Sequence, residues 1–192
     1  RREASAVSPD GNRKTQLESI VGSVSRETFD KLESFEAQFR KWNSAINLVA
    51  PSTLPDLWQR HILDSAQLVP FAGAAEKWVD LGSGGGFPGA IVAILLRESC
   101  TVHLVESNQK KAAFLRTTLA ALGIERAFIH AKRIEEAAAA IGAADIVSAR
   151  ALTALTALFG LSAPYMGDHG RALFHKGRDY RREVEESRDV WK

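Results

Sequence analysis

A glycine-rich segment in the middle of the chain limits the possible folds more than any other stretch. It reads Asp80-Leu81-Gly82-Ser83-Gly84-Gly85-Gly86-Phe87-Pro88-Gly89. It follows a short apolar run and precedes a helical pattern, which is where an open α/β sheet binds ligands beyond the carboxyl ends of its strands. Glycines there allow positive φ angles and let a ligand approach bare backbone. We therefore expect this segment to form the floor of a ligand pocket.

Short apolar runs and longer helical stretches alternate on both sides of this segment. The runs at 78–81, 102–105, 127–130, 145–149 and 171–174 predict five strands. The stretches at 88–97, 108–122, 134–141, 151–165 and from 178 onward predict the intervening helices. Five βα units in series predict an α/β fold with a doubly wound, Rossmann-like parallel sheet.

The chain before the sheet has apolar residues at helical spacing from residue 15 to about 71. Ser25 is expected to cap the second helix, and a further helix is expected over 54–69. We therefore expect a helical cap at 15–72 and the sheet domain at 73–192. Residues 1–14 are polar and are expected to be a disordered tail or a trimmed start.

Composition excludes some classes of protein. The longest apolar runs fall short of the roughly 18 to 20 residues that a membrane span requires, and no apolar signal core precedes them. The single cysteine, Cys100, excludes a disulfide within the chain and favours a reducing compartment. The five histidines do not cluster, so no metal site is expected. We expect a soluble, cytoplasmic protein.

The glycine-rich segment fits two cofactors. Gly84, Gly86 and Gly89 satisfy the G-x-G-x-x-G pattern of dinucleotide-binding proteins, which would suit NAD. Asp80 favours S-adenosylmethionine, because a carboxylate repels a pyrophosphate but can pair with the ammonium group of a methionine moiety.

Charged residues follow three further strand candidates. Glu106 lies 22 residues beyond Gly84 and is expected to accept hydrogen bonds from ribose hydroxyls, unless it is only a solvated loop residue. Arg150 either faces the methyl donor or an anionic substrate, or pairs with Asp80 or Glu106. Glu135 is by itself typical of a charged helix start.

The expected helical cap contains the polar run Arg60-His61-Ile62-Leu63-Asp64-Ser65. Helical spacing places Arg60 and Asp64 on one face, so that the run by itself is typical of an ion pair within one helix.

These pieces occur together and in order, and on them the chain resembles the RsmG family, also called glucose-inhibited division protein B. The matching pieces cover roughly residues 30–178. They are Trp42-Asn43 to Asn47-Leu48, Arg60 to Ser65, Asp80 to Gly89, Val105-Glu106-Ser107 to Lys110-Lys111, Arg133-Ile134-Glu135, Ser148-Ala149-Arg150-Ala151 and Lys176-Gly177.

The resemblance implies a class I methyltransferase that transfers a methyl group from S-adenosylmethionine, leaving S-adenosylhomocysteine. The implied acceptor is ring nitrogen 7 of a guanine in the 530 loop (position 527) of bacterial 16S ribosomal RNA, free or within the small subunit. A monomer is expected. The alternatives are an NAD-dependent oxidoreductase and a non-catalytic RNA-binding protein.

The resemblance also assigns residues. The expected donor-binding residues are Asp80, Gly82, Ser83, Gly84, Phe87, Glu106, Ile134, Glu135 and Arg150, of which Arg150 is also a candidate for catalytic positioning. The expected substrate-binding residues are Asn47, Arg60, His61, Asp64, Ser65 and Lys176. Class I methyltransferases usually end in a β-hairpin, which we expect to be missing because the chain stops at Lys192 within a charged helix.

Overall fold

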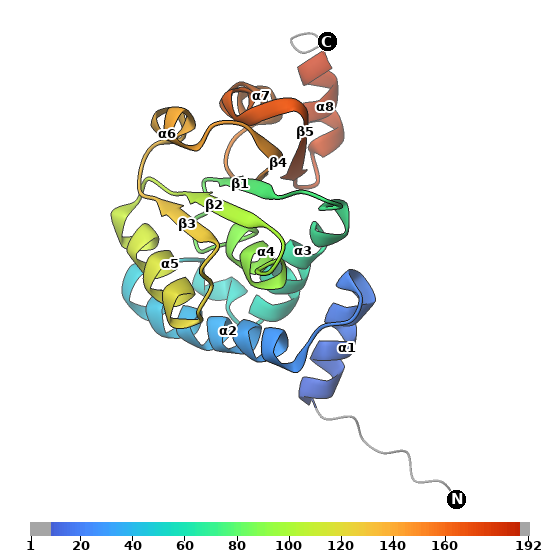
Figure 1. Cartoon of the computed structure of the whole chain (residues 1–192), viewed down its shortest axis with the longest axis vertical. Helices are drawn as coiled ribbons and strands as arrows, with labels where there is room; N and C mark the ends of the chain where they lie inside the picture. The colour runs from blue at the N-terminus through green and yellow to red at the C-terminus, as the bar shows by residue number, and fades with distance from the viewer. Residues whose placement is uncertain (1–8, 189–192) are drawn as a thin grey trace, which may run out of the picture.

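The protein is built around one sheet of five parallel strands in the order β3-β2-β1-β4-β5 (Figure 1). The computed structural model describes residues 9–188. The strands are β1 (Lys77–Leu81), β2 (Thr101–Val105), β3 (Ala127–His130), β4 (Ala144–Arg150) and β5 (Met166–His175). Because β1 is central and the later strands are added on both sides of it, the predicted doubly wound sheet is confirmed.

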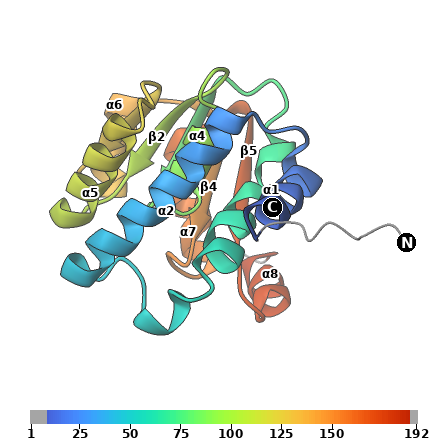
Figure 2. The same ribbon diagram turned by 90° about the horizontal axis from the view of Figure 1, so that it is seen from below.

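Helices cover both faces of the sheet (Figures 1 and 2). On one face lie α1 (Pro9–Val21), α2 (Arg26–Ile46), α3 (Asp64–Ala66), α4 (Gly89–Leu95) and α5 (Gln109–Ala121). On the other lie α6 (Ile134–Ile141) and α7 (Leu155–Ser162), with α8 (Tyr180–Arg188) beside α7. The short turns are η1 (Pro51–Thr53), η2 (Trp58–Leu63), η3 (Val69–Phe71) and η4 (Ala163–Tyr165).

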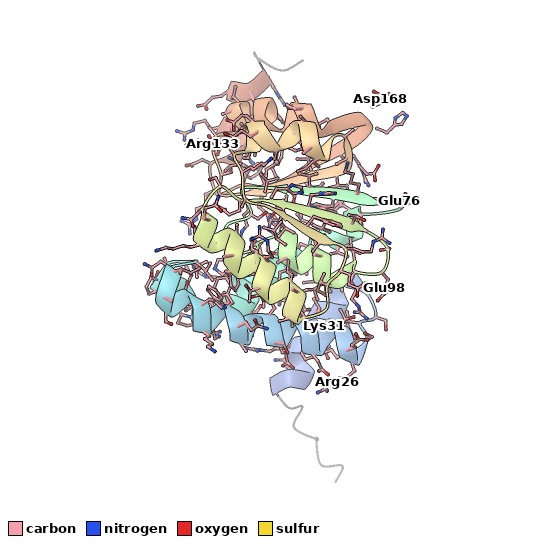
Figure 3. The ribbon with its side chains drawn as sticks, turned by 60° about the vertical axis from the view of Figure 1, so that its left-hand side comes forward. Arg26, Lys31, Glu76, Glu98, Arg133 and Asp168 are labelled. Atoms are coloured by element: carbon pink, nitrogen blue, oxygen red, sulfur yellow. The ribbon has the colours of Figure 1, made fainter. Side chains whose placement is uncertain are left out.

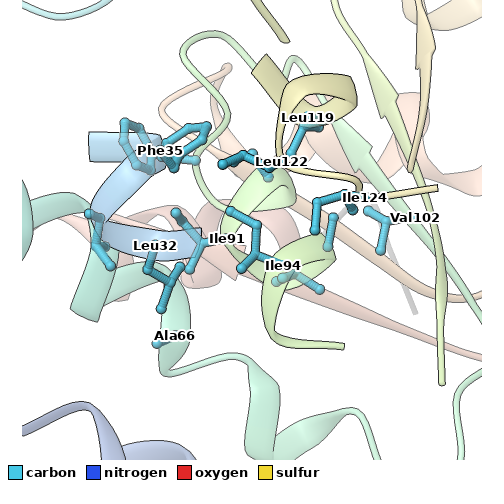
Figure 4. Close-up of a cluster of buried hydrophobic side chains, with 14 of the residues drawn as sticks. Leu32, Phe35, Ala66, Ile91, Ile94, Val102, Leu119, Leu122 and Ile124 are labelled. Atoms are coloured by element: carbon cyan, nitrogen blue, oxygen red, sulfur yellow. The ribbon is translucent and has the colours of Figure 1, made fainter. Parts of the chain in front are cut away.

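Side chains of the central strand alternate between two apolar cores, because successive strand residues face opposite sides of a sheet. Trp78 belongs to the core shared with α2, α4 and α5, whereas Val79 and Leu81 belong to the core under α6 and α7. Figure 4 shows part of the first core, where side chains of α2, α4 and β2 gather. Burial on both faces explains why apolar side chains follow one another at Trp78 and Val79 instead of alternating with exposed polar ones, and why Asp80 of this strand is buried as well.

Helix α2 joins the helical cap to the sheet. Its expected N-cap is confirmed, because the Ser25 hydroxyl accepts a hydrogen bond from the Thr28 amide at 3.1 Å. Phe35 and Phe39 are fully buried, and the Phe39 ring lies 5.2 Å from Phe87 and 5.7 Å from Phe114 between ring centroids. The cap and the sheet therefore share one core.

Helix α1 corrects the expectation of a tail for residues 9–14, since it begins at Pro9. Proline suits the first position of a helix. The sequence of α1 has no apolar residue between Pro9 and Leu17. At this end of the helix, Arg13 contacts α2 and η2 through its positive charge. Its guanidinium contacts the Glu36 carboxylate at 3.0 Å and lies 4.9 Å from the centroid of the Trp58 ring. Residues 1–8 lie outside the described residues.

The regular helix predicted over 54–69 is wrong. The chain instead forms the wider π-helical turn η2, one turn of α3 and the turn η3. A proline within η3 lacks the amide hydrogen that a continuing helix requires. Because a π-helical turn spaces its residues differently from an α-helix, the faces predicted for residues 60–65 change as well.

The predicted helix over 151–165 is also shorter than expected. It begins at Leu155 after a loop in which Ala151 has a φ angle of +51°. Strand β5 is longer than predicted and contains a register shift where it pairs with the start of β4. Within residues 9–188, no helix is long and apolar enough to cross a membrane.

Candidate functional site

A cavity of about 570 Å³ opens where β1, β2 and β4 end and α6 begins. The register aligns the ends of the three strands, since Leu81 pairs with both Val105 and Ala149. Figure 3 shows Arg133 at this end of the sheet and Glu76 at the opposite end. Of the predicted donor-binding residues, the following line the cavity: Gly82, Ser83, Gly84, Phe87, Glu106, Ile134, Glu135 and Arg150. The expected position of the pocket is confirmed.

The floor of the cavity is backbone, as the glycines predicted. Gly82 and Gly84 have φ angles of +67° and +56°, which residues with a Cβ atom rarely adopt. The Ser83 amide donates to the Val105 carbonyl at 3.0 Å, and its carbonyl accepts from the Gly86 amide at 2.7 Å. The loop is thus bonded to β2 on one side and turns back on itself on the other.

Asp80 lies beneath this floor and does not line the cavity. Its carboxylate is fully buried and accepts hydrogen bonds from the Ser148 hydroxyl at 2.7 Å and the Gly89 amide at 3.1 Å. Burial raises the pKa of Asp80 to about 6 despite these bonds. This geometry corrects the expectation of direct pairing with an ammonium group, because the carboxylate is buried beneath the loop and is not exposed to the cavity.

Glu106 is held rigidly at the end of β2. One carboxylate oxygen accepts from the Gly84 amide at 2.8 Å, and the other accepts from the Asn108 amide at 2.7 Å. A carboxylate has about four acceptor positions, so each oxygen retains capacity for one more donor. Since Glu106 lines the cavity, it is suited to receive two neighbouring hydroxyl groups.

The start of α6 forms another wall. Ile134 is half-buried and Glu135 is exposed, and no side chain caps the first amides of this helix. The Ile134 carbonyl accepts a hydrogen bond from the Tyr165 hydroxyl, which fixes the position of this helix start. An apolar side chain beside uncapped amides is suited to the face and edge of a purine ring.

Arg150 joins the sheet to the helical cap at the mouth of the cavity. Its guanidinium donates to His61 Nδ1 at 2.6 Å, and to the Asp64 carboxylate and the Arg60 carbonyl at 3.2 Å each. It also lies 5.2 Å from the centroid of the Phe87 ring, on which His61 stacks at 5.0 Å. Asp64 therefore pairs with Arg150 across the fold, while Arg60 pairs with Asp56 at 3.5 Å.

The hydrogen bond from Arg150 fixes the state of His61. A ring nitrogen that accepts a hydrogen bond carries no proton, so the proton lies on Nε2. Burial and then the charge of Arg150 lower the pKa of His61 to about 4, which keeps the ring neutral near pH 7. No hydrogen-bond partner for the buried Nε2 atom is present among the described residues.

His61 and His103 predict a loss of stability in mild acid. The pKa of His103 is also lowered to about 4, first by burial and then by His130 and Lys77. At these two histidines the unfolded chain binds protons below pH 6.5 that the folded chain takes up only near pH 4, so their contribution to stability falls as the pH drops through this window.

The expected loss is about 1 kcal/mol per histidine between pH 7 and pH 5, after allowance for half-exposed rings. Urea unfolding at both pH values would measure it. The His61→Gln/His103→Gln variant should lose less stability on acidification than the parent does, and an equal loss in both would contradict the assignment.

The predicted substrate residues separate into two groups. Ser65 is buried, and its hydroxyl donates to the His61 carbonyl at 2.5 Å. It therefore holds the turn that carries His61 and Asp64, both of which contact Arg150. Asn47 is exposed and ends α2 with a φ angle of 49°, outside the cavity lining. Lys176 lies near α8, where it contacts Glu183 at 2.6 Å. Their roles in RNA binding stay predictions.

Two residues that contact the site from outside the cavity lining were not among the predicted site residues. His175 pairs in register with Arg150, and its Nδ1 lies 3.9 Å from the Asp64 carboxylate. Its position at a strand end could have shown this, because parallel strands end at one edge. Buried Asn43 accepts from the Val49 amide at 2.8 Å and shapes the loop at residues 48–50, which line the cavity. No group of three metal-ligating side chains occurs within the described chain.

Comparison with known proteins gives a family match over most of the chain. Residues 28–192 match the family model GidB, described as rRNA small subunit methyltransferase G. A "Ribosomal RNA small subunit methyltransferase G" from Chelativorans sp. (strain BNC1) is 60% identical over 177 residues, covering 91% of this chain and 84% of that protein. One of the same name from Brucella canis (strain ATCC 23365 / NCTC 10854 / RM-666) is 54% identical, covering 91% and 83%.

Solved structures support the fold. The SAH-bound Podospora anserina methyltransferase PaMTH1 is 12% identical, covers 85% of this chain and 67% of that chain, and superposes with a TM-score of 0.57. At this identity, the likeness shows a shared class I methyltransferase fold, as predicted.

Proposed function

Because the chain belongs to the rRNA small subunit methyltransferase G family, we propose that it methylates ring nitrogen 7 of a guanine in the 530 loop of bacterial 16S ribosomal RNA, at position 527. Family membership makes the chain an S-adenosylmethionine-dependent rRNA methyltransferase. What we propose in addition is the methylated atom, nitrogen 7 of guanine, and its location in the 530 loop. One observation carries it: the Arg60–Ser65 and Ser148–Ala151 motifs meet through Arg150 at the mouth of the cavity.

The cavity residues fit S-adenosylmethionine. We propose that Glu106 receives the ribose hydroxyls, since its rigid carboxylate retains acceptor capacity. Ile134 and the uncapped start of α6 suit the adenine ring, and the bare backbone of Gly82 and Gly84 leaves room for the rest of the molecule. Its amino group is not proposed to pair directly with Asp80.

When bound, S-adenosylmethionine supplies a methyl group on a positively charged sulfur, which the free lone pair of guanine nitrogen 7 can attack directly. No proton has to leave that nitrogen. The protein therefore has to align the guanine with the methyl group and does not need a general base that accepts a proton. His61 agrees with this proposal, because its Nδ1 atom is bonded to Arg150 and its low pKa leaves it little basicity. We propose that Arg150, Phe87 and His61 position the base.

The target guanine has to be unstacked to reach this position, since its reactive edge faces the deep, narrow groove of an RNA helix. We propose that Lys111, Lys132 and Arg133 contact the phosphates around it. They line the cavity, and within residues 12–188 no ion pair engages them. Arg60 and Lys176, by contrast, contact acidic side chains.

Methyl transfer from labelled donor to small-subunit RNA tests the proposal. We expect label on nitrogen 7 of one guanine in the 530 loop, in free 16S RNA, a precursor particle or the assembled subunit. Mapping of the modified base by mass spectrometry after nuclease digestion would show the position. Label on another atom or loop would contradict the proposed specificity, and no label in all three substrates would favour a non-catalytic RNA-binding role.

A binding measurement separates the donor from the NAD alternative. Isothermal titration with S-adenosylhomocysteine and with NAD should give heat of binding for the first only. The reverse preference would contradict the donor assignment.

A further inference from the structure

One wall of the cavity is a loop that its own sequence does not hold in place. We call residues 151–154 the wall loop. Ala151 and Leu152 line the cavity, and the Leu152 side chain packs against Gly82. A Cβ atom on Gly82 would stand only 2.6 Å from Leu152 Cδ1. The width of the cavity at Gly82 therefore depends on where the wall loop lies.

The backbone of the wall loop is strained and lacks a local cap. Ala151 has a φ angle of +51°, which costs a residue with a Cβ atom about 1 kcal/mol or more. Ala154 occupies the N-cap position of α7 and has no side chain that can accept from the first amides of the helix. Other elements have to keep this loop against the cavity.

Helix α8 provides that support through one carboxylate. A single oxygen of Glu183 accepts from the Leu155 amide at 2.8 Å and from the Lys176 ammonium at 2.6 Å. Lys176 also donates to the Thr153 carbonyl at 2.9 Å. Glu183 thus caps α7 from another helix, and Lys176 links the same carboxylate to the backbone of the wall loop.

The charge of Glu183 suits this role. The hydrogen bond from Lys176 holds the pKa of Glu183 below its usual range, so the carboxylate is ionised at neutral pH. A negative charge at the N-terminus of α7 is favourable because the first amides of a helix are positive. On the next turn of α8, Glu186 lies beside the same junction but contacts Arg182 at 3.7 Å, and among the described residues it accepts no hydrogen bond from the wall loop or the start of α7.

We propose that Glu183 and Lys176 are positioning residues that set the affinity for the methyl donor by holding the wall loop closed over Gly82. The wall loop that bounds the cavity on this side is held from behind by α8, about 100 residues away in sequence from the glycine-rich floor. The inference rests on the donor site of the proposed function and is independent of which RNA atom is methylated.

Titration with S-adenosylhomocysteine tests the junction. Glu183→Ala should raise the Kd about tenfold, which corresponds to one charge-assisted hydrogen bond. Glu183→Gln should have a smaller effect, because its carbonyl oxygen can still accept from Leu155. The matched control Glu186→Ala should leave the Kd unchanged. Urea unfolding of each variant separates a loss of affinity from a loss of folded protein.

A charge exchange distinguishes the junction from a simple ion pair. In Lys176→Glu/Glu183→Lys an ion pair can form again, but residue 183 cannot accept from Leu155 and residue 176 cannot donate to Thr153. We expect the exchange variant to have a Kd as high as that of Glu183→Ala. We also expect the amides of residues 151–155 to exchange hydrogen faster in both variants than in the parent protein. Restored affinity in the exchange variant, or an unchanged Kd in Glu183→Ala, would overturn the proposal. If the parent protein itself fails to bind, the donor site is at fault instead.

Discussion

Gly89→Ala is expected to lower the free energy of unfolding by about 2 to 4 kcal/mol, because it both overpacks a core site and disturbs a buried carboxylate. A Cβ atom at Gly89 would stand 2.5 Å from Asp80 Oδ2 and 2.7 Å from Asp80 Cβ. Asp80 has no room to move, since it is fully buried and bonded to Ser148. Urea unfolding at pH 7 would measure the change.

Gly160→Ala is the matched control for this prediction. Gly160 lies within α7, and nothing lies within 4 Å of the position of its added Cβ atom. Alanine there should raise the free energy of unfolding by about 0.5 to 1 kcal/mol, because glycine weakens a helix interior. If both alanine variants changed stability alike, the close approach of Gly89 to Asp80 would not be the cause.

The sequence predicted the sheet well because burial leaves a strong pattern. Strand β3 (Ala127–His130) and helix α6 (Ile134–Ile141) have the bounds that were predicted, and the other strands differ by a residue or more at their ends. Central parallel strands are covered on both faces, so that apolar runs mark them. The glycines marked the pocket floor, since few other residues can adopt its backbone angles.

The sequence could not predict features that depend on long-range contacts. Asp80 was expected to face the ligand, but the amide of Gly89, nine residues later, turns its carboxylate inward. Asp64 was expected to pair along one helix, but a π-helical turn and a guanidinium 86 residues away direct it to the sheet. These hydrogen-bond partners come together only when distant segments pack in the folded protein. The spacing of residues along the sequence therefore does not predict them.

Glu106→Gln is expected to raise the Kd for S-adenosylhomocysteine about 100-fold, since it removes charge-assisted bonds to ribose and disturbs the loop. Both oxygens of Glu106 accept backbone amides, and an amide side chain can offer only one acceptor. Its NH₂ group would then face the amide of Gly84 or Asn108, donor against donor. Isothermal titration would measure the change, with Glu136→Gln, exposed and outside the cavity lining, as a control of much smaller effect.

A ligand lacking both ribose hydroxyls separates the two causes of this loss. If Glu106 acts by receiving the hydroxyls, the parent protein should bind dideoxy S-adenosylhomocysteine weakly, and Glu106→Gln should weaken that binding little further. If Glu106 acts only by holding Gly84, the variant should weaken both ligands by the same factor. The difference between the two factors is the coupling energy between the carboxylate and the ribose. We expect most of the effect to appear as coupling, because the introduced glutamine side chain can keep one of the two backbone bonds.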